Sequence, residues 1–225
     1  MVTWRYERYN ESRKFQHSEF AMQDQGERLI SWTNPGLDMC GRFDFTWDEE
    51  VPAISRMLNL VKEKYPGAEL PKGEISPSAE FPVLIRGADK ADIAFMRWGM
   101  PGRGRPIINA RSETANRLPL FRDAFEARRG VILTTGFYEW SHDGAKTKYQ
   151  FRLPGSGVTY LAALYDDAGR YVILTEAANA SMIGIHDRMP VILGGGEVLP
   201  WLRDGGFARE VLCRPGPILD KRQAG

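Results

Sequence analysis

Cysteine is scarce in this sequence, and long apolar runs are missing. The 225 residues include two cysteines, Cys40 and Cys213, which are too few for a disulfide framework and form no zinc-binding pattern. No apolar stretch approaches the roughly 18 residues that a membrane helix needs. The N-terminus is polar and contains acidic residues, which excludes a signal or transit peptide. We therefore expect a cytoplasmic protein with reduced thiols, no metal, no organic cofactor and no membrane partner.

A strong charge of one sign is missing as well. The chain has 30 basic and 29 acidic residues, so its net charge is +1. Any basic surface must then be local, and the composition neither favours nor excludes a nucleic-acid partner. Hydrophobic residues make up 43% of the chain, which is ordinary for a globular protein. Nothing in the sequence points to an oligomer, so we expect a monomer.

The composition changes near residue 38. Before it, aliphatic side chains are few and follow no sustained period, whereas a regular pattern begins at Phe43. We predict an N-terminal extension over residues 1–39 that is disordered, removed or not normally translated. Residues 40–225 then form one domain.

The pattern after Phe43 mixes helices with more numerous short strands. A capping-box spacing at 46–49 and apolar residues at helical intervals from Val51 to Val61 predict a helix that ends at Pro66-Gly67. Further helices are expected at 118–128, 178–183, 197–203 and 207–212. Strands are expected at 81–86, 93–98, 131–135, 148–153, 159–164 and 171–175. Strands that are not evenly alternated with helices favour an α+β fold with a curled, largely antiparallel, barrel-like sheet flanked by helices.

Cys40 follows Met39 directly, and this order has chemical consequences. If translation starts at Met39 and the methionine is removed, Cys40 carries a free α-amine beside its thiol. The amine forms a Schiff base with an aldehyde, and the thiol then closes a five-membered thiazolidine ring. An internal cysteine cannot do this, because amide resonance removes the nucleophilicity of its nitrogen.

Four segments place reactive side chains near the ends of predicted strands. They are Met39–Arg42, the run from Ile107 to Thr114 that follows Trp98–Pro101, the run from Thr135 to Trp140, and Ala178-Asn179 leading to Ile185–Pro190. Each also has a purely structural interpretation, such as a buried cysteine, a carboxylate held by an arginine, or a structural histidine. No single segment decides between these interpretations.

Together, in this order, the four segments resemble the SRAP family (SOS response-associated peptidase), whose members process abasic sites. The resemblance rests on Met-Cys-Gly-Arg, Asn-Ala-Arg-x-Glu-Thr with its preceding Trp-Gly, Gly-Phe-x-Glu-Trp and His-Asp-Arg-x-Pro, and covers residues 40 to about 212. It implies the SRAP fold and a covalent trap for abasic sites in single-stranded DNA. It also implies a part in the DNA damage response, in DNA repair and in the SOS response, at damaged DNA in the nucleoid.

The resemblance also implies a catalytic set of Cys40, Asn109, Glu139 and His186. Cys40 would form the thiazolidine crosslink with the sugar aldehyde. Glu139 would move protons during ring opening and amine attack, and His186 would protonate the departing hydroxyl or polarise the sugar oxygen. Asn109 would orient the amine or the deoxyribose.

Arginine is the best candidate for contacts with DNA phosphates, because it offers a fork of donors and a permanent charge. Arg42, Arg111 and Arg188 lie within the matching segments. Arg103 and Arg105 lie in the loop Pro101–Pro106, which either grips phosphate or is a solvated loop with incidental charge. That loop has no aromatic residue for base stacking, and we expect Trp98 and Phe137 to lie in the core.

Three accounts of residues 1–39 stay open. In the first, translation starts at Met39. In the second, the extension is made and then cut off, either by another protease or by the chain's own peptidase activity. In the third, the extension persists and blocks thiazolidine formation. Two rival functions also stay open, a thiol peptidase using Cys40, Glu139 and His186, and a single-strand DNA-binding module without covalent chemistry. Schiff-base chemistry further predicts weak lyase activity at abasic sites.

Overall fold

The computed structural model describes residues 21–22, 30–31 and 41–224, and the chain divides into two compact units, Met1–Leu37 and Asp38–Gly225. In the first unit, β1 (Ala21–Met22) pairs antiparallel with β2 (Ile30–Ser31). Cys40 and most of the N-terminal extension lie outside the described residues. All other elements belong to the second unit.

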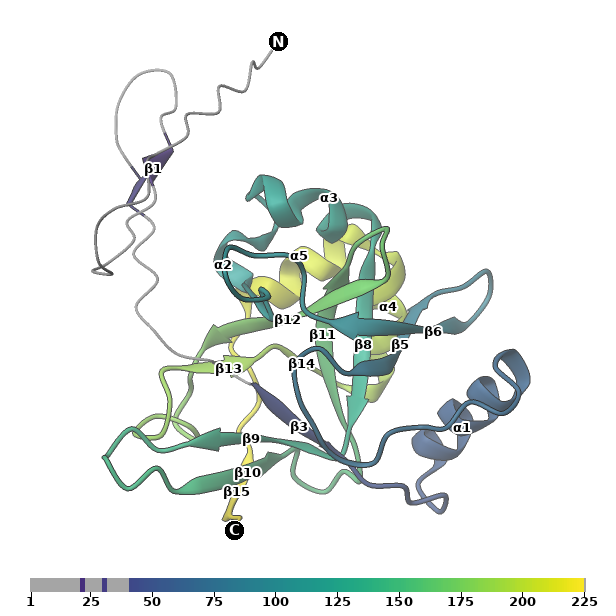
Figure 1. Ribbon diagram of the computed structural model, residues 1–225, viewed down its shortest axis with the longest axis horizontal. Coiled ribbons are helices and arrows are strands. Elements are labelled where there is room, and N and C mark those ends of the chain that lie inside the picture. Colours follow the sequence, from purple (N-terminus) through teal and green to yellow (C-terminus); the bar gives the residue numbers. More distant parts are fainter. Residues whose placement is uncertain (1–20, 23–29, 32–40, 225) are drawn as a thin grey trace. The chain divides into compact units, whose positions relative to one another are not determined.

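A closed ring of strands forms the centre of the second unit (Figure 1). Its members, in spatial order, are β12 (Arg170–Ala177), β6 (Ala91–Trp98), β5 (Glu80–Arg86), β8 (Arg129–Thr134) and β11 (Thr159–Tyr165). β11 pairs back with β12, which closes the ring. Every neighbouring pair in the ring is antiparallel except β12 with β6. Closure leaves the ring no free edge and confirms the curled, largely antiparallel sheet.

Short strands extend this ring where β12 and β11 leave it. β7 (Asn109–Arg111) runs parallel to the middle of β12, β13 (Arg188–Pro190) pairs with its end, and β14 (Ile192–Leu193) pairs with the start of β11. β12 therefore lies between two of the segments that the sequence analysis singled out.

A second, five-stranded antiparallel sheet carries the other two segments. In spatial order it contains β15 (Asp220–Gln223), β10 (Lys148–Arg152), β9 (Gly136–Trp140), β3 (Arg42–Phe45) and β4 (Gly73–Ile75). One of its faces buries Phe43, Phe45, Phe137 and Phe151 in the core. Thr135 joins the two sheets, since its amide donates to the carbonyl of Asp44 and its hydroxyl accepts from the amide of Thr46.

The helices cover the outside of the ring (Figure 1). They are α1 (Pro52–Lys64), α2 (Ser112–Ala115), α3 (Pro119–Ala127), η1 (Gly195–Glu197), α4 (Val198–Arg203) and α5 (Gly205–Cys213). Arg129 of β8 is buried and donates from Nε to the carbonyl of Trp201 and from Nη1 to that of Phe125, both at 2.6 Å. One guanidinium thereby satisfies carbonyls near the ends of α3 and α4, which otherwise lack partners.

The predicted strands and most predicted helices are confirmed, but two local predictions were wrong. The helix expected at 178–183 is a series of turns, because the Asn179 side chain bonds to the amide of Ser181 and to the distant carbonyls of Gly216 and Pro217. The capping box at 46–49 is not used either. Thr46 bonds instead to Asp44 and Thr135, and α1 begins at Pro52, whose fixed φ suits the first helical position.

Trp98 and Phe137 are fully buried, as expected of core residues. Trp98 stacks on Tyr171 and donates from its indole nitrogen to the carbonyl of Ile108 at 3.0 Å. Among the described residues, no helix is both long and apolar enough to cross a membrane.

Candidate functional site

Glu139 lies on the core-facing side of the second sheet, which is an unusual place for a carboxylate. Along β9 the burial alternates, so Phe137 and Glu139 face inward while Tyr138 and Trp140 face outward. Glu139 is only 2% exposed. Burying an ionised carboxylate costs on the order of several kcal/mol unless the carboxylate has hydrogen-bonding or charged partners. A position of this kind is typical of groups that act chemically.

The pairing of β3 with β9 relates Glu139 to the segment that follows Cys40. Arg42 is opposite Tyr138 and Phe43 is opposite Phe137. One more step in the same register sets Gly41 opposite Glu139. The residue that precedes Gly41 is Cys40, which lies outside the described residues.

Arg42 shares the outward face with Tyr138, because directly opposed residues of an antiparallel pair point to the same side. Its Nε donates to Glu74 at 3.1 Å, and Lys148 also pairs with Glu74 while lying over the Tyr138 ring. Arg42 and Glu139 therefore lie on opposite faces of one sheet. The structure does not bring these two predicted site residues together, and the phosphate contact of Arg42 stays a prediction.

His186 lies in the turns between β12 and β13 and is 5% exposed. Its Nδ1 is 3.1 Å from the amide nitrogen of Arg188, which donates to an unprotonated Nδ1, and 3.0 Å from Oδ1 of Asp187, which favours a protonated one. Burial lowers the pKa of His186 below its ordinary value, although Asp187 acts in the opposite direction. The neutral ring with its proton on Nε2 is then the main form near pH 7, and Nε2–H is available as a donor.

His142 connects this loop to the strand that carries Glu139. It follows β9 by two residues, is exposed, and packs its ring edge-to-face on His186 with centroids 4.8 Å apart. Ser141 and Asp143 order the intervening hairpin, since the Ser141 hydroxyl bonds to Oδ1 of Asp143 at 2.6 Å. The hairpin that follows Glu139 thus contacts the His186 loop, because His142 lies three residues beyond Glu139.

Asn109 and Arg111 lie on one face of β7, and the buried Ala110 lies on the opposite face. The backbone there is well held, because the carbonyl of Ile108 accepts bonds from the Trp98 indole and from the amide of Ile173, both at 3.0 Å. Arg111 is exposed at the end of β7 and keeps a guanidinium accessible for phosphate.

Arg188 and Glu113 join the Asn109 segment to the His186 segment. Arg188 forms a forked pair with Glu113, with Nη2 to Oε2 at 2.8 Å, and the same Nη2 donates to the carbonyl of Thr175 at 2.6 Å. Burial alone would raise the pKa of Glu113, but the hydrogen bond from Arg188 and the charges of Arg188 and Arg111 hold it below its ordinary value. The Arg188 side chain is 12% exposed, so it presents little surface to a phosphate. Its phosphate contact stays a prediction.

Arg103 and Arg105 are exposed in the loop between β6 and β7. Met100 and Ile107 close the base of the loop by two backbone hydrogen bonds, at 2.9 and 2.8 Å. A Cβ at Gly102 would lie 2.4 Å from the carbonyl of Arg105, so the tight turn requires glycine there. The loop presents both arginines to solvent in a defined hairpin.

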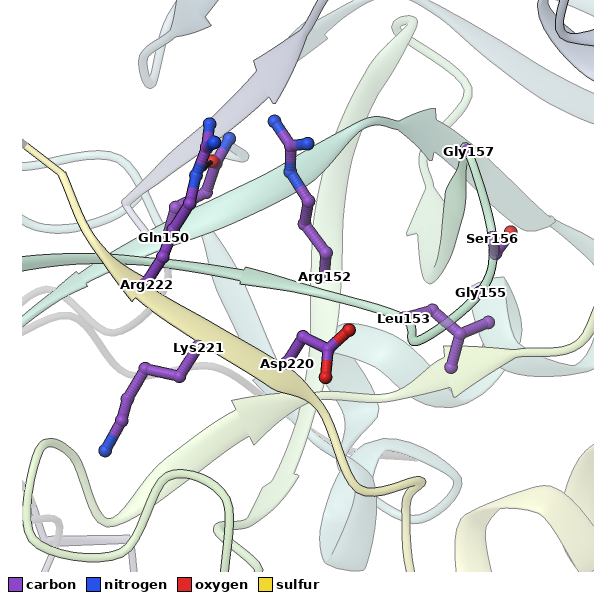
Figure 2. A pocket seen from close by; sticks show the side chains of 9 residues that line it. All are labelled: Gln150, Arg152, Leu153, Gly155, Ser156, Gly157, Asp220, Lys221 and Arg222. Carbon is purple, nitrogen blue, oxygen red and sulfur yellow. Dashed lines mark hydrogen bonds between the residues drawn. The ribbon is translucent and has the colours of Figure 1, made fainter.

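A hollow of about 400 Å³ lies elsewhere, on the β10–β15 side of the second sheet (Figure 2). It is lined by Gln150, Arg152, Leu153, Gly155, Ser156, Gly157, Asp220, Lys221 and Arg222. Of the predicted catalytic residues that the structure describes, Asn109, Glu139 and His186 are not part of this lining. Within the described part of the chain, no group of three or more His, Cys, Asp or Glu residues is arranged to hold a metal ion.

A model of the family described as SOS response associated peptidase (SRAP) matches residues 39–215. The chain belongs to the SRAP family. The match begins at Met39, directly before Cys40, and includes every predicted site residue. The predicted family is confirmed.

Relatives of this SRAP chain carry a common description. The abasic site processing protein YoqW of Bacillus subtilis is 32% identical over 181 residues, which cover 73% of this chain and 80% of YoqW. YedK of Escherichia coli, with the same description, is 27% identical over 179 residues, covering 73% and 80%. HMCES of Xenopus tropicalis, also so described, is 29% identical over 177 residues, covering 58% of this chain and 53% of HMCES.

Solved structures share the SRAP chain's fold. A protein of Bordetella bronchiseptica superposes with a TM-score of 0.65 at 24% identity and covers 83% of this chain and all of its own. A protein of Bacteroides thetaiotaomicron gives a TM-score of 0.66 at 21% identity, covering 82% and 91%. At this identity the likeness shows the fold alone.

Sequence reasoning missed two residues that shape the site of this SRAP chain, His142 and Glu113. Glu113 stands inside the Asn-Ala-Arg-x-Glu-Thr segment, so its position was a usable signal. His142 had no signal, because only the fold brings its hairpin against the His186 loop.

Proposed function

We propose that this protein processes abasic sites in single-stranded DNA by forming a covalent thiazolidine crosslink through Cys40. Family membership and the shared description of the relatives support the abasic site as the substrate. The observation that carries the chemical proposal is the buried carboxylate of Glu139, which the register of β3 and β9 sets opposite Gly41.

The chemistry balances with the loss of one water. The neutral α-amine of Cys40 attacks the C1′ aldehyde of the ring-opened sugar and forms a carbinolamine. The hydroxyl leaves as water when the Schiff base forms, taking the proton that Glu139 removed from the amine, while the neutral His186 ring donates a hydrogen bond from Nε2–H to the departing oxygen. The thiol then adds to the imine carbon, its proton passes to the nitrogen, and the ring closes. The reference pKa of an α-amine, about 7.7–8.0, leaves a useful neutral fraction near pH 7.

Glu139 is the proposed proton carrier. It would take a proton from the attacking amine and assist opening of the sugar ring, which general acid–base catalysis accelerates. Asn109 would orient the amine or the deoxyribose. Arg111, Arg103 and Arg105 are exposed and would contact phosphates on the single strand, together with the predicted Arg42 and Arg188.

The chemistry requires an amine at Cys40, so residues 1–39 must be absent from the active protein. We propose that residues 40–225 are the functional domain and that the extension is either not translated or removed. Self-cleavage by the same residues would be a single-use peptidase reaction, in line with the family's description.

The decisive experiment is an intact-mass spectrum of protein expressed from Met39, before and after incubation with single-stranded DNA that holds one abasic site. We expect a mass that begins at Cys40 and then increases by the mass of the DNA less one water. The same oligonucleotide without the abasic site is the control. The absence of an adduct at any pH from 6 to 8 would exclude the trap.

The same experiment with protein expressed from Met1 tests the extension. A mass that begins at Cys40 indicates removal of the extension in the cell. A mass that begins at Met1, with no adduct, indicates that the extension blocks the chemistry. Turnover of a peptide substrate without any DNA adduct would instead favour the thiol peptidase. Equal DNA binding by wild type and Cys40→Ala, with no covalent species, would favour a simple DNA-binding module.

A further inference from the structure

The loop that carries His186 is built around one side chain, that of Asn179. The loop spans residues 178–187, between β12 and β13, and the amide of Ala178 closes its base by donating to the carbonyl of Asp187 at 2.9 Å. The backbone carbonyl of Asn179 accepts from the amides of Met182 and Ile183, both at 3.0 Å. The carbonyl of Met182, a fully buried residue, then accepts from the amides of Ile185 and His186.

The side chain of Asn179 uses its whole hydrogen-bonding capacity. Oδ1 accepts from the amide of Ser181 at 3.0 Å and from its hydroxyl at 2.5 Å. Nδ2 donates to the carbonyls of Gly216 and Pro217, at 3.0 and 2.8 Å. Only a primary amide offers two acceptor sites and two donors in this arrangement. Asn179 therefore both shapes the turn that leads to His186 and ties it to a segment 37 residues away.

That segment, residues 214–219, connects α5 to β15, and we name it the C-terminal strap (Figure 1). Arg214 anchors its start by a forked pair with Glu197, at 2.5 Å for each contact. At Gly216 the strap passes so close to Glu176 that a Cβ would lie 2.5 Å from Oε1. Leu219 is buried at its end. The strap is thus a fixed support, and the Asn179 side chain joins the loop to it by two hydrogen bonds.

The strap also leads to the sheet that carries Glu139. It continues into β15, which pairs with β10, and β10 pairs with β9, where Tyr149 is opposite Glu139. Arg222 of β15 reinforces this edge by donating from Nε to Gln150 at 2.6 Å, in the wall of the hollow of Figure 2. One continuous piece of chain therefore supports both halves of the proposed acid–base pair. The family match ends at residue 215, just before the two carbonyls that Asn179 grips.

We propose that Asn179 is a positioning residue for abasic-site processing, which sets the orientation of His186 by tying its loop to the C-terminal strap. The inference rests on the proposed function, because it gives His186 a role in crosslinking. It assigns Asn179 no contact with DNA or with the reacting atoms.

The test compares Asn179→Ala and Asn179→Asp with wild type. The alanine variant removes all four side-chain bonds, whereas aspartate keeps an acceptor for Ser181 but places a carboxylate oxygen against two carbonyls. We expect the maximal crosslinking rate at saturating abasic-site DNA to fall at least tenfold in both variants. The DNA concentration for half-maximal rate should stay within twofold, because the DNA contacts are intact. Asn59→Asp on α1 adds the same charge at an exposed position and should match wild type.

An NMR titration of His186 in the full chain supplies a readout that does not depend on crosslinking. If the loop loosens in Asn179→Ala, burial is relieved and the pKa of His186 moves upward toward its ordinary value. Loss of thermal stability with an unchanged rate and an unchanged titration would overturn the proposal, because Asn179 would then be structural only. If wild type forms no crosslink, the proposed function fails, and the titration still decides whether Asn179 positions His186.

Discussion

The ring of His142 packs on the ring of His186 with centroids 4.8 Å apart and planes at 66°. One ring is exposed and the other is buried, so a group in contact with solvent touches the proposed hydrogen-bond donor of the site. Electrostatic repulsion from His142 is one of the influences that lower the pKa of His186, after burial.

Replacing His142 with phenylalanine should raise the pKa of His186, because the ring contact remains while the repelling charge is lost. The acid limb of the crosslinking rate should move to higher pH, with at most a few-fold change in the rate at pH 7.5. Rate profiles from pH 5 to 8 for wild type, His142→Phe and His142→Ala measure this. If the limb stays in place for the phenylalanine variant, the charge of His142 has no influence on His186.

Replacing Glu139 with glutamine should slow crosslinking on the order of 100-fold or more, because a general acid–base group contributes that much when correctly placed. Affinity for abasic-site DNA should not fall, since Glu139 is buried and makes no proposed phosphate contact. Single-turnover rates and fluorescence-anisotropy titrations measure the two effects. Glu80→Gln, at an exposed position, is the control. An unchanged rate removes Glu139 from the mechanism.

Loss of the thiol should expose a second reaction of the same Schiff base. In Cys40→Ala, removal of Met39 leaves an N-terminal alanine whose amine still condenses with the aldehyde. No thiol can close the ring, so the proton next to the imine is lost and the strand is cleaved by β-elimination. We expect more cleaved product from this variant than from wild type on denaturing gels. Equal cleavage by protein whose N-terminal amine is acetylated would mean that the amine is not involved.

Replacing Glu113 with glutamine should destabilise the domain by about 1 kcal/mol, because the largely buried Arg188 side chain loses the charged partner of its fork. The pKa of Glu113 is lowered in the folded state, so its contribution is present above the ordinary pKa of a glutamate and is lost as the pH falls through the lowered value. Urea unfolding at pH 7 should therefore show the difference from wild type, and unfolding at acid pH should show less. Glu126→Gln, which removes an exposed pair with Arg209, should cost less.

Glu176 should make the domain less stable as the pH rises. Burial raises its pKa to about 7 in the folded protein, against a hydrogen bond from the Gly216 amide and the charge of Arg188, which lower it. The folded state then holds a proton that the unfolded state has lost between about pH 4.5 and 7, so stability falls across that window. Glu176→Gln should unfold at a higher temperature than wild type at pH 8 and at nearly the same temperature at pH 4.5. Glu210→Gln, at an exposed position on α5, should show no such trend.

The strands of the ring were predictable because their apolar runs are continuous. β8 and β11 are buried on both faces, and most of their residues are apolar. β3 and β9 were harder, since each mixes polar and aromatic residues in a short segment that local propensity does not separate from a loop. The turn at 178–183 was mistaken for a helix because its i to i+3 and i+4 spacing resembles one. Its actual form depends on the side-chain bonds of Asn179 to Ser181 and to the distant strap.

The sequence alone identified the family, the ring of strands and the residues of the proposed site, because periodicity and the order of four short segments are local properties of the chain. Only the tertiary structure decided which face each residue occupies and which neighbours it has. Arg42 is separated from Glu139 by a sheet because pairing register assigns alternate residues to opposite faces. His142 reaches His186, and Asn179 reaches the strap, because contacts between distant segments depend on how the whole chain closes on itself.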